Sequence, residues 1–105
     1  MDIEQLEDKI KQSEALMVYF SGEFCNVCKV LQPKIKDAFS KNYPKIEQLY
    51  ISADDYKQTA AKIGVFALPT IIIYFDGKEQ KRKSRNLSVD GLIEELKRPY
   101  TLFFD

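Results

Sequence analysis

Two cysteines, Cys25 and Cys28, lie between two segments with different patterns, and this arrangement constrains the fold more than any other feature. Residues 15–20 before them form a near-continuous apolar run, which is typical of a strand buried on both faces of a sheet. Residues 29–39 after them have apolar side chains at helical spacing. The expected inward-facing residues of this helix are Val30, Leu31, Ile35, Ala38 and Phe39. The chain therefore predicts a strand, a tight turn that carries both cysteines, and a helix.

A cysteine at the first turn of a helix has a defined reactivity. The N–H groups of that turn have no partner within the helix, and the helix dipole is positive there, so a thiolate is stabilised and the thiol pKa falls. One helical turn further on, a second sulfur lies close enough to attack a mixed disulfide. The spacing of Cys25 and Cys28 therefore predicts a pair that reduces, oxidises or exchanges disulfides. We expect no cofactor, because the reaction takes place at the two sulfurs.

The same spacing also occurs in metal sites and in inert structural pairs. A metal site is disfavoured because the chain has no second cysteine pair and no histidine. Carboxylates or a second chain would have to complete the ligand set. We expect no metal, but a metal or cluster shared across a dimer and a structural pair both stay open as alternatives.

Length and charge limit the classes of function. A chain of 105 residues fits one domain, 1–105, with a modest core. The net charge of zero gives no overall field that favours nucleic acid or a membrane surface. The start of the chain has no pattern of a signal peptide, and its apolar runs are too short to span a bilayer. We therefore expect a cytoplasmic monomer with no nucleic-acid or membrane partner. In the reducing cytoplasm, such a cysteine pair is more often catalytic than structural.

The rest of the chain predicts alternating helices and strands. Helices are expected over residues 3–10, from Asp54 or Asp55 as the N-cap through 63, and over 88–97 before Pro99. Strands are expected over residues 46–51, 70–75 and 78–84. The early strand–helix–strand units predict parallel strands, and the late hairpin adds an antiparallel edge. The expected fold class is α/β, with a mixed central sheet and helices on both faces.

Motifs along the whole chain carry a resemblance to a known family. They are the strand 15–20, Cys25-Asn26-Val27-Cys28-Lys29, Pro33, Val65-Phe66-Ala67-Leu68-Pro69-Thr70, the turn Phe75-Asp76-Gly77-Lys78, and the helix capped by Ser88. The cysteine motif alone is weakly specific, but its combination with Leu68-Pro69-Thr70 in this element order is strongly specific. From end to end the chain resembles thioredoxin. The resemblance implies a three-layer α/β/α thioredoxin fold and a thiol–disulfide oxidoreductase that reduces protein disulfides and contributes to cell redox homeostasis.

The resemblance also implies roles for individual residues. Cys25 would be the attacking thiolate and Cys28 the resolving thiol. Pro69 would follow a cis peptide bond and face the sulfurs, and the backbone of Leu68 would pair with an extended substrate peptide. The substrate groove would be lined by Phe24, Phe66, Ala67, Leu68 and Pro69. The implied partners are protein substrates that contain disulfides and a disulfide reductase that donates electrons.

The sequence departs from the family pattern near the cysteines. Asn26 and Val27 replace the usual Gly-Pro, so they are expected to modulate the reduction potential and the thiol pKa values. Lys29 either supports the Cys25 thiolate or is a solvated helix residue. Tyr19 stands where the family buries an aspartate thought to accept the proton of the resolving thiol. A phenol with a pKa of about 10 is a poor base at neutral pH. Arg85 stands where the family often has glycine.

A second class of function stays open beside the oxidoreductase. It is a non-enzymatic binding module of the same fold, in which the groove is a peptide site or the cysteines hold a metal between two chains. The presence of both cysteines favours the enzyme. The basic run 78–85 is interpreted as a charged edge strand rather than a docking patch. The apolar end, residues 100–105, is expected to fold back on the domain.

Overall fold

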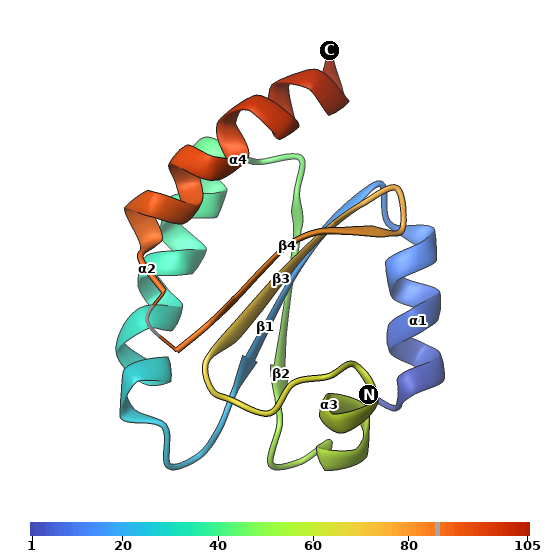
Figure 1. Ribbon diagram of the computed structural model, residues 1–105, viewed down its shortest axis with the longest axis vertical. Helices are drawn as coiled ribbons and strands as arrows, with labels where there is room; N and C mark the ends of the chain where they lie inside the picture. Colours follow the sequence, from blue (N-terminus) through green and yellow to red (C-terminus); the bar gives the residue numbers. More distant parts are fainter. Residues whose placement is uncertain (86) are drawn as a thin grey trace.

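The chain forms one sheet with helices on both faces in a computed structural model that describes residues 1–85 and 87–105. The elements in order are α1 (Ile3–Gln12), β1 (Ala15–Ser21), α2 (Asn26–Asn42), β2 (Glu47–Ser52), α3 (Lys57–Lys62), β3 (Thr70–Phe75), β4 (Lys78–Ser84) and α4 (Val89–Phe104). The strand order is β2-β1-β3-β4. In Figure 1, α2 and α4 cover one face of the sheet, and α1 and α3 cover the other. The predicted three-layer α/β fold with a mixed sheet is confirmed.

The central strand β1 explains why the run before the cysteines is apolar at every position. Its residues alternate between the two faces of the sheet, as successive strand residues must. Ala15, Met17 and Tyr19 belong to the core under α2 and α4. Leu16, Val18 and Phe20 belong to the core under α1 and α3. None of the six is more than 2% exposed, so β1 is held rigidly between two helical layers and fixes the start of the cysteine turn.

The direction of β3 differs from the expected succession of parallel strands. β1 and β2 are parallel, with Phe20 beside Ile51, whereas β3 is antiparallel to β1, with Phe20 beside Thr70. The six residues of α3 span only about 9 Å at 1.5 Å per residue. The helix therefore does not run the length of β2, which is about 20 Å long, and in Figure 1 it lies at one end of the sheet. β3 therefore begins at the end of the sheet where β1 and β2 finish, beside the cysteines.

The start of α3 also differs from the prediction. The helix begins after Tyr56, whose side chain makes no capping hydrogen bond, so the assignment of Asp54 or Asp55 as its N-cap is wrong. The Asp54 carboxylate instead accepts a hydrogen bond from the N–H of Glu23, in the loop after β1. The N–H of Asp55 donates to Ser52 Oγ within the turn. The Asp54 carboxylate therefore bonds to a distant segment of the chain and does not cap α3, although the local sequence predicts a cap.

The last helix continues past Pro99 to Phe104, so the prediction that Pro99 ends it is wrong. Proline removes one helical hydrogen bond, but aromatic contacts after it hold the chain in place. The Tyr100 ring lies 4.6 Å from the Tyr43 ring, and Phe103 stacks on Phe75 at 5.0 Å between centroids. The apolar end therefore packs on the domain as expected, but as the last turns of a helix.

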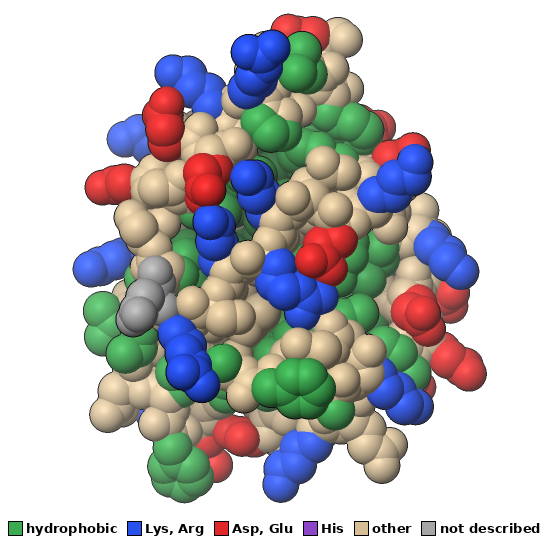
Figure 2. All heavy atoms as spheres, in the orientation of Figure 1, with side chains coloured by type: hydrophobic (Ala, Val, Ile, Leu, Met, Phe, Trp, Pro, Cys, Tyr) green, Lys and Arg blue, Asp and Glu red, His purple; other side chains and the backbone are tan. Residues whose placement is uncertain are grey.

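The basic run lies on β4, an edge strand of the sheet. Three of its cations have acidic partners: Arg82 pairs with Glu79 at 2.8 Å, and Lys83 and Lys81 pair with Glu95 at 3.0 and 4.0 Å. Figure 2 shows acidic side chains among the basic ones on this face rather than a single basic field. These pairs support the interpretation of a charged edge strand that discourages pairing with another sheet.

Arg85 has a left-handed backbone conformation, with φ 56°. A side chain with a Cβ atom is disfavoured there by about 1 kcal/mol or more, and glycine is not. The Arg85 N–H donates to the Pro69 carbonyl at 2.9 Å, which holds the strained residue beside the predicted groove. We expect Arg85→Gly to raise the free energy of unfolding in urea by about 0.5–1 kcal/mol. The control Gln80→Gly, in the extended β4, should lower it, and a less stable Arg85→Gly would contradict the assignment of strain.

Candidate active site

The two cysteines lie where the sequence predicts, in the turn from β1 to α2. Cys25 is the N-cap residue of α2, and its sulfur accepts a hydrogen bond from the Cys28 N–H at 3.2 Å. The two sulfurs form a disulfide with an S–S distance of 2.10 Å. The positive end of α2 therefore faces the Cys25 sulfur, and a negative charge on that atom is stabilised.

The two sulfurs differ in access to solvent. Cys28 is only 1% exposed, beneath the surface of the molecule. Cys25 is half-buried at the rim of the turn. A substrate can therefore reach Cys25, whereas Cys28 faces the protein interior.

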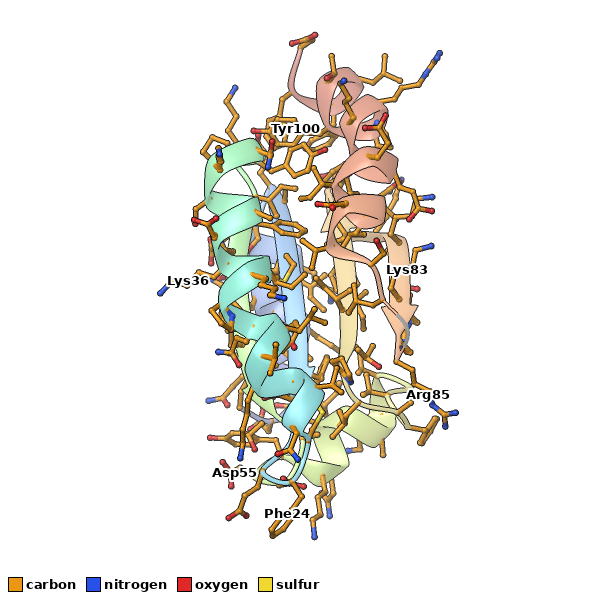
Figure 3. All side chains as sticks on the ribbon, turned by 90° about the vertical axis from the view of Figure 1, so that its left-hand side faces the viewer. Phe24, Lys36, Asp55, Lys83, Arg85 and Tyr100 are labelled. Atoms are coloured by element: carbon orange, nitrogen blue, oxygen red, sulfur yellow. A yellow bond between two sulfur atoms is a disulfide. The ribbon has the colours of Figure 1, made fainter. Side chains whose placement is uncertain are left out.

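Large exposed apolar side chains stand next to the cysteines in the chain and in the segment before Pro69. Phe24 is 90% exposed, Phe66 83% and Val27 58%. Figure 3 shows Phe24 at the tip of the turn, at the same end of the molecule as Arg85. Large apolar side chains that gather in solvent mark an interaction surface, so this end of the molecule is suited to bind apolar parts of a protein substrate.

Val30 extends this surface and corrects a prediction. It was expected to face the core, but it is 60% exposed. At 100° per residue, Val30 lies about 140° around the helix from the buried Ile35. Of the α2 residues expected to face the core, Val30 therefore belongs to the exposed surface. Its angular position around the helix could have distinguished it from the core residues.

The segment before β3 meets the cysteine turn. The Leu68–Pro69 peptide bond is cis, as the resemblance implies. A methyl group on Gly22 would lie 2.7 Å from Leu68 Cδ1, so glycine permits the close approach of the two segments. Thr70 Oγ1 donates to the Ala67 carbonyl at 2.6 Å and fixes the segment from its other end.

The backbone of Leu68 is available for hydrogen bonding. Neither its N–H nor its carbonyl has a hydrogen-bond partner among the residues that the structure describes. Leu68 and Ala67 are half-buried, and Pro69 is buried beneath them. The five residues predicted to line the groove therefore lie at one end of the molecule, on two segments that contact each other.

Tyr19 lies beneath Cys28, as its position in the resemblance implies. The side chain is fully buried, and its hydroxyl donates to the Cys28 carbonyl at 3.0 Å. Burial, with a smaller effect of Tyr50, raises the pKa of Tyr19 to about 12. The phenol therefore stays protonated at neutral pH, where it anchors the first turn of α2 and does not act as a base.

The remaining residues predicted to modulate the site lie on the first turn of α2. Asn26 and Val27 are its first two residues, and both are exposed. Lys29 is also exposed and lies on the rim of a hollow beside Cys28. All three are thus close to the sulfurs, and their effects on the reduction potential stay predictions.

A model of the Thioredoxin family matches residues 1–98. The chain belongs to the thioredoxin family. The chain is 32% identical to the thioredoxin-like protein YdfQ of Bacillus subtilis, over 93% of this chain and 87% of that protein. It is also 32% identical to a thioredoxin of Chlamydia muridarum, over 78% of this chain and 79% of the other. The solved structure of thioredoxin 1 from Thermosipho africanus has a TM-score of 0.76 at 30% identity, over 83% of this chain and 96% of that one.

Family and geometry together give the class of reaction. A thioredoxin whose two cysteines lie at disulfide distance is a thiol–disulfide oxidoreductase acting on protein disulfides. The non-enzymatic alternative is therefore not favoured. Across residues 1–85 and 87–105, no three His, Cys, Asp or Glu side chains are placed to hold a metal ion. In the same ranges no helix is long and apolar enough to cross a membrane.

Proposed function

We propose that this thioredoxin reduces protein disulfides, with Cys25 as the nucleophile and Cys28 as the resolving thiol. The observation that carries the proposal is the difference between the two sulfurs. Cys25 is half-buried at an apolar surface and caps α2, whereas Cys28 is 1% exposed beneath it. A substrate disulfide meets the accessible sulfur first, and the second sulfur is within reach once the mixed disulfide has formed.

The reaction has two exchange steps. The Cys25 thiolate attacks one sulfur of the substrate disulfide and displaces the other as a thiolate, which takes up a proton. Cys28 then loses its proton and attacks the Cys25 sulfur, and the second substrate thiolate leaves. Two electrons have passed to the substrate, and the Cys25–Cys28 disulfide remains. A disulfide reductase returns two electrons to the pair.

The surface around Cys25 favours protein substrates with an extended segment beside the disulfide. The Leu68 backbone would form β-type hydrogen bonds with that segment, because such bonds do not depend on the substrate sequence. Phe24, Val27 and Phe66 would add apolar contacts, since all three are largely exposed. Ala67 and Pro69 would form the floor beneath the peptide.

We further propose that the chain works as a single-domain monomer in the cytoplasm, where it contributes to electron transport and redox homeostasis. A reducing compartment keeps a dithiol available for reaction. The net charge of zero gives no reason to expect a nucleic-acid or membrane partner.

The reduction potential of the Cys25–Cys28 pair tests the direction of the reaction. The protein is equilibrated with glutathione buffers, and the fraction of disulfide is measured by alkylation and mass spectrometry. We expect a reduction potential of about −270 mV, which is typical of thioredoxin, whereas a potential of about −120 mV would identify an oxidant. The double variant with serine at positions 25 and 28 is the control, because any alkylation that it shows must occur at groups other than the two cysteines.

A further inference from the structure

The resolving step needs a proton acceptor that the residues described above do not supply. Cys28 is 1% exposed, and burial raises the pKa of a thiol because it disfavours the charged thiolate. Tyr19 lies beneath it, but its pKa of about 12 keeps the phenol protonated. Its hydroxyl proton is also already donated to the Cys28 carbonyl. Another group must therefore take the proton when Cys28 attacks at neutral pH.

A polar hollow of about 310 Å³ opens beside Cys28. It lies between the cysteine turn, the first turns of α2 and the loop after β2. Its lining residues are Ser21, Gly22, Glu23, Cys28, Lys29, Gln32, Ser52, Asp54 and Asp55. A water molecule occupies about 30 Å³ of liquid and needs two to four polar partners, so this hollow has room and partners for several. Cys28 and Asp54 thus border the same polar hollow.

The Asp54 carboxylate is fixed to the loop that carries the cysteines. Its Oδ2 accepts a hydrogen bond from the Glu23 N–H. A methyl group on Gly22 would lie 3.3 Å from the same oxygen, so the carboxylate rests against the backbone of the turn. Glu23, Asp54 and Asp55 are all exposed and all border the hollow. Among the described residues, Asp54 is the one of the three whose carboxylate accepts a backbone hydrogen bond from the cysteine turn. Asp54 is therefore the carboxylate whose place in the hollow is fixed.

We propose that Asp54 accepts, through water in this hollow, the proton that Cys28 loses in the resolving step. The inference depends on the role of Cys28 in the proposed function. The S–H bond of Cys28 breaks, and its proton passes through water to the carboxylate. The resulting thiolate forms a bond to the Cys25 sulfur, and the bond from Cys25 to the substrate breaks. The substrate leaves as a thiolate, and Asp54 then releases the proton to solvent.

Several charged groups border the two hollows that Asp54 lines. They are Glu23 from the cysteine turn, Lys29 from α2, Asp55 and Lys57 from its own segment, and the Met1 amino group and Asp2 across a second hollow. Replacing Asp54 with asparagine leaves all of them in place and keeps an oxygen that can accept the Glu23 N–H. A change in pH dependence on this substitution therefore reports Asp54 itself.

The test separates the two exchange steps by stopped-flow absorbance. The reduced protein is mixed with 5,5′-dithiobis(2-nitrobenzoate), which releases one thiolate when the mixed disulfide forms and a second when Cys28 resolves it. We expect Asp54→Asn to slow the second release at pH 7 by about tenfold or more, since general bases contribute 10²–10⁴-fold when directly placed. The first release should change by less than about twofold, because Cys25 does not use this hollow. The matched control Asp55→Asn should leave both releases unchanged.

The pH profile and chemical rescue distinguish a proton acceptor from a residue that only supports the turn. With Asp54 present, the second release should vary little between pH 6 and 8. In Asp54→Asn it should rise about tenfold per pH unit, as the thiolate fraction of Cys28 rises. In Asp54→Ala, added formate should restore the second release, because a small carboxylate can enter the hollow.

Two results would overturn the inference while leaving the proposed function intact. One is a second release in Asp54→Asn with the wild-type rate and pH profile. The other is a slower release whose pH profile is unchanged and which formate does not restore, since this would indicate a structural role. If the wild-type protein gave no first release at all, the proposed function would itself be wrong.

Discussion

Replacing Cys25 with serine is expected to abolish the reduction of protein disulfides, whereas replacing Cys28 with serine is expected to stop the reaction after its first step. Cys25 is the accessible sulfur at the N-terminus of α2, and a serine hydroxyl is not a nucleophile toward disulfides. In Cys28→Ser the first exchange still occurs, but no second sulfur can attack. The mixed disulfide with the substrate should therefore accumulate, and it is measured on a non-reducing gel with a purified disulfide-containing protein.

The control for trapped complexes is the double variant, which should form none. Alkylation of the reduced wild-type protein at pH 7 gives a second measurement. Cys25 should react much faster than Cys28, because its thiolate is stabilised by the helix and Cys28 is 1% exposed. If Cys25→Ser trapped complexes instead, the roles of the two cysteines would be reversed. If both cysteines were alkylated at equal rates, neither could be assigned as the nucleophile.

The fold and the cysteine turn could be predicted because their signals are local. An apolar run is buried on both faces only in a covered strand, and β1 is such a strand. The hairpin after β3 could also be predicted, because Asp-Gly favours the two positive φ angles that this type of turn requires. In the structure, Asp76 and Gly77 have φ values of 53° and 75°. Each of these features depends on a few neighbouring residues.

Other features could not be predicted because distant contacts decide them. Pro99 is a strong local signal to end a helix, yet the contact of Phe103 with Phe75 keeps the following turn helical. Asp54 is a plausible cap in the sequence, yet its carboxylate bonds to Glu23. The hollow that joins Asp54 to Cys28 exists only after the loops at the ends of β1 and β2 have come together. The sequence thus predicted where the two sulfurs lie, but it did not predict which side chains lie around them.

Replacing Tyr19 with aspartate is expected to lower the free energy of unfolding by about 3–5 kcal/mol, the range for removing a large buried aromatic side chain. Tyr19 is fully buried, and its ring lies 5.7 Å from that of Tyr50. The substitution also removes the hydrogen bond to the Cys28 carbonyl and buries a carboxyl group, whose pKa rises as a result. Urea denaturation at pH 7 measures the loss, and Tyr19→Phe, which removes only the hydroxyl, should cost about 1–2 kcal/mol.

The same two variants show what the residue beneath Cys28 does in the reaction. In an Asp54→Asn background, Tyr19→Asp should raise the rate of the resolving step, because it supplies a carboxylate close to Cys28. Tyr19→Phe should leave that rate nearly unchanged, since the phenol, with a pKa of about 12, accepts no proton at neutral pH. If Tyr19→Phe stopped turnover while the protein stayed folded, the hydroxyl would take part in the reaction, and its role would extend beyond anchoring the first turn of α2.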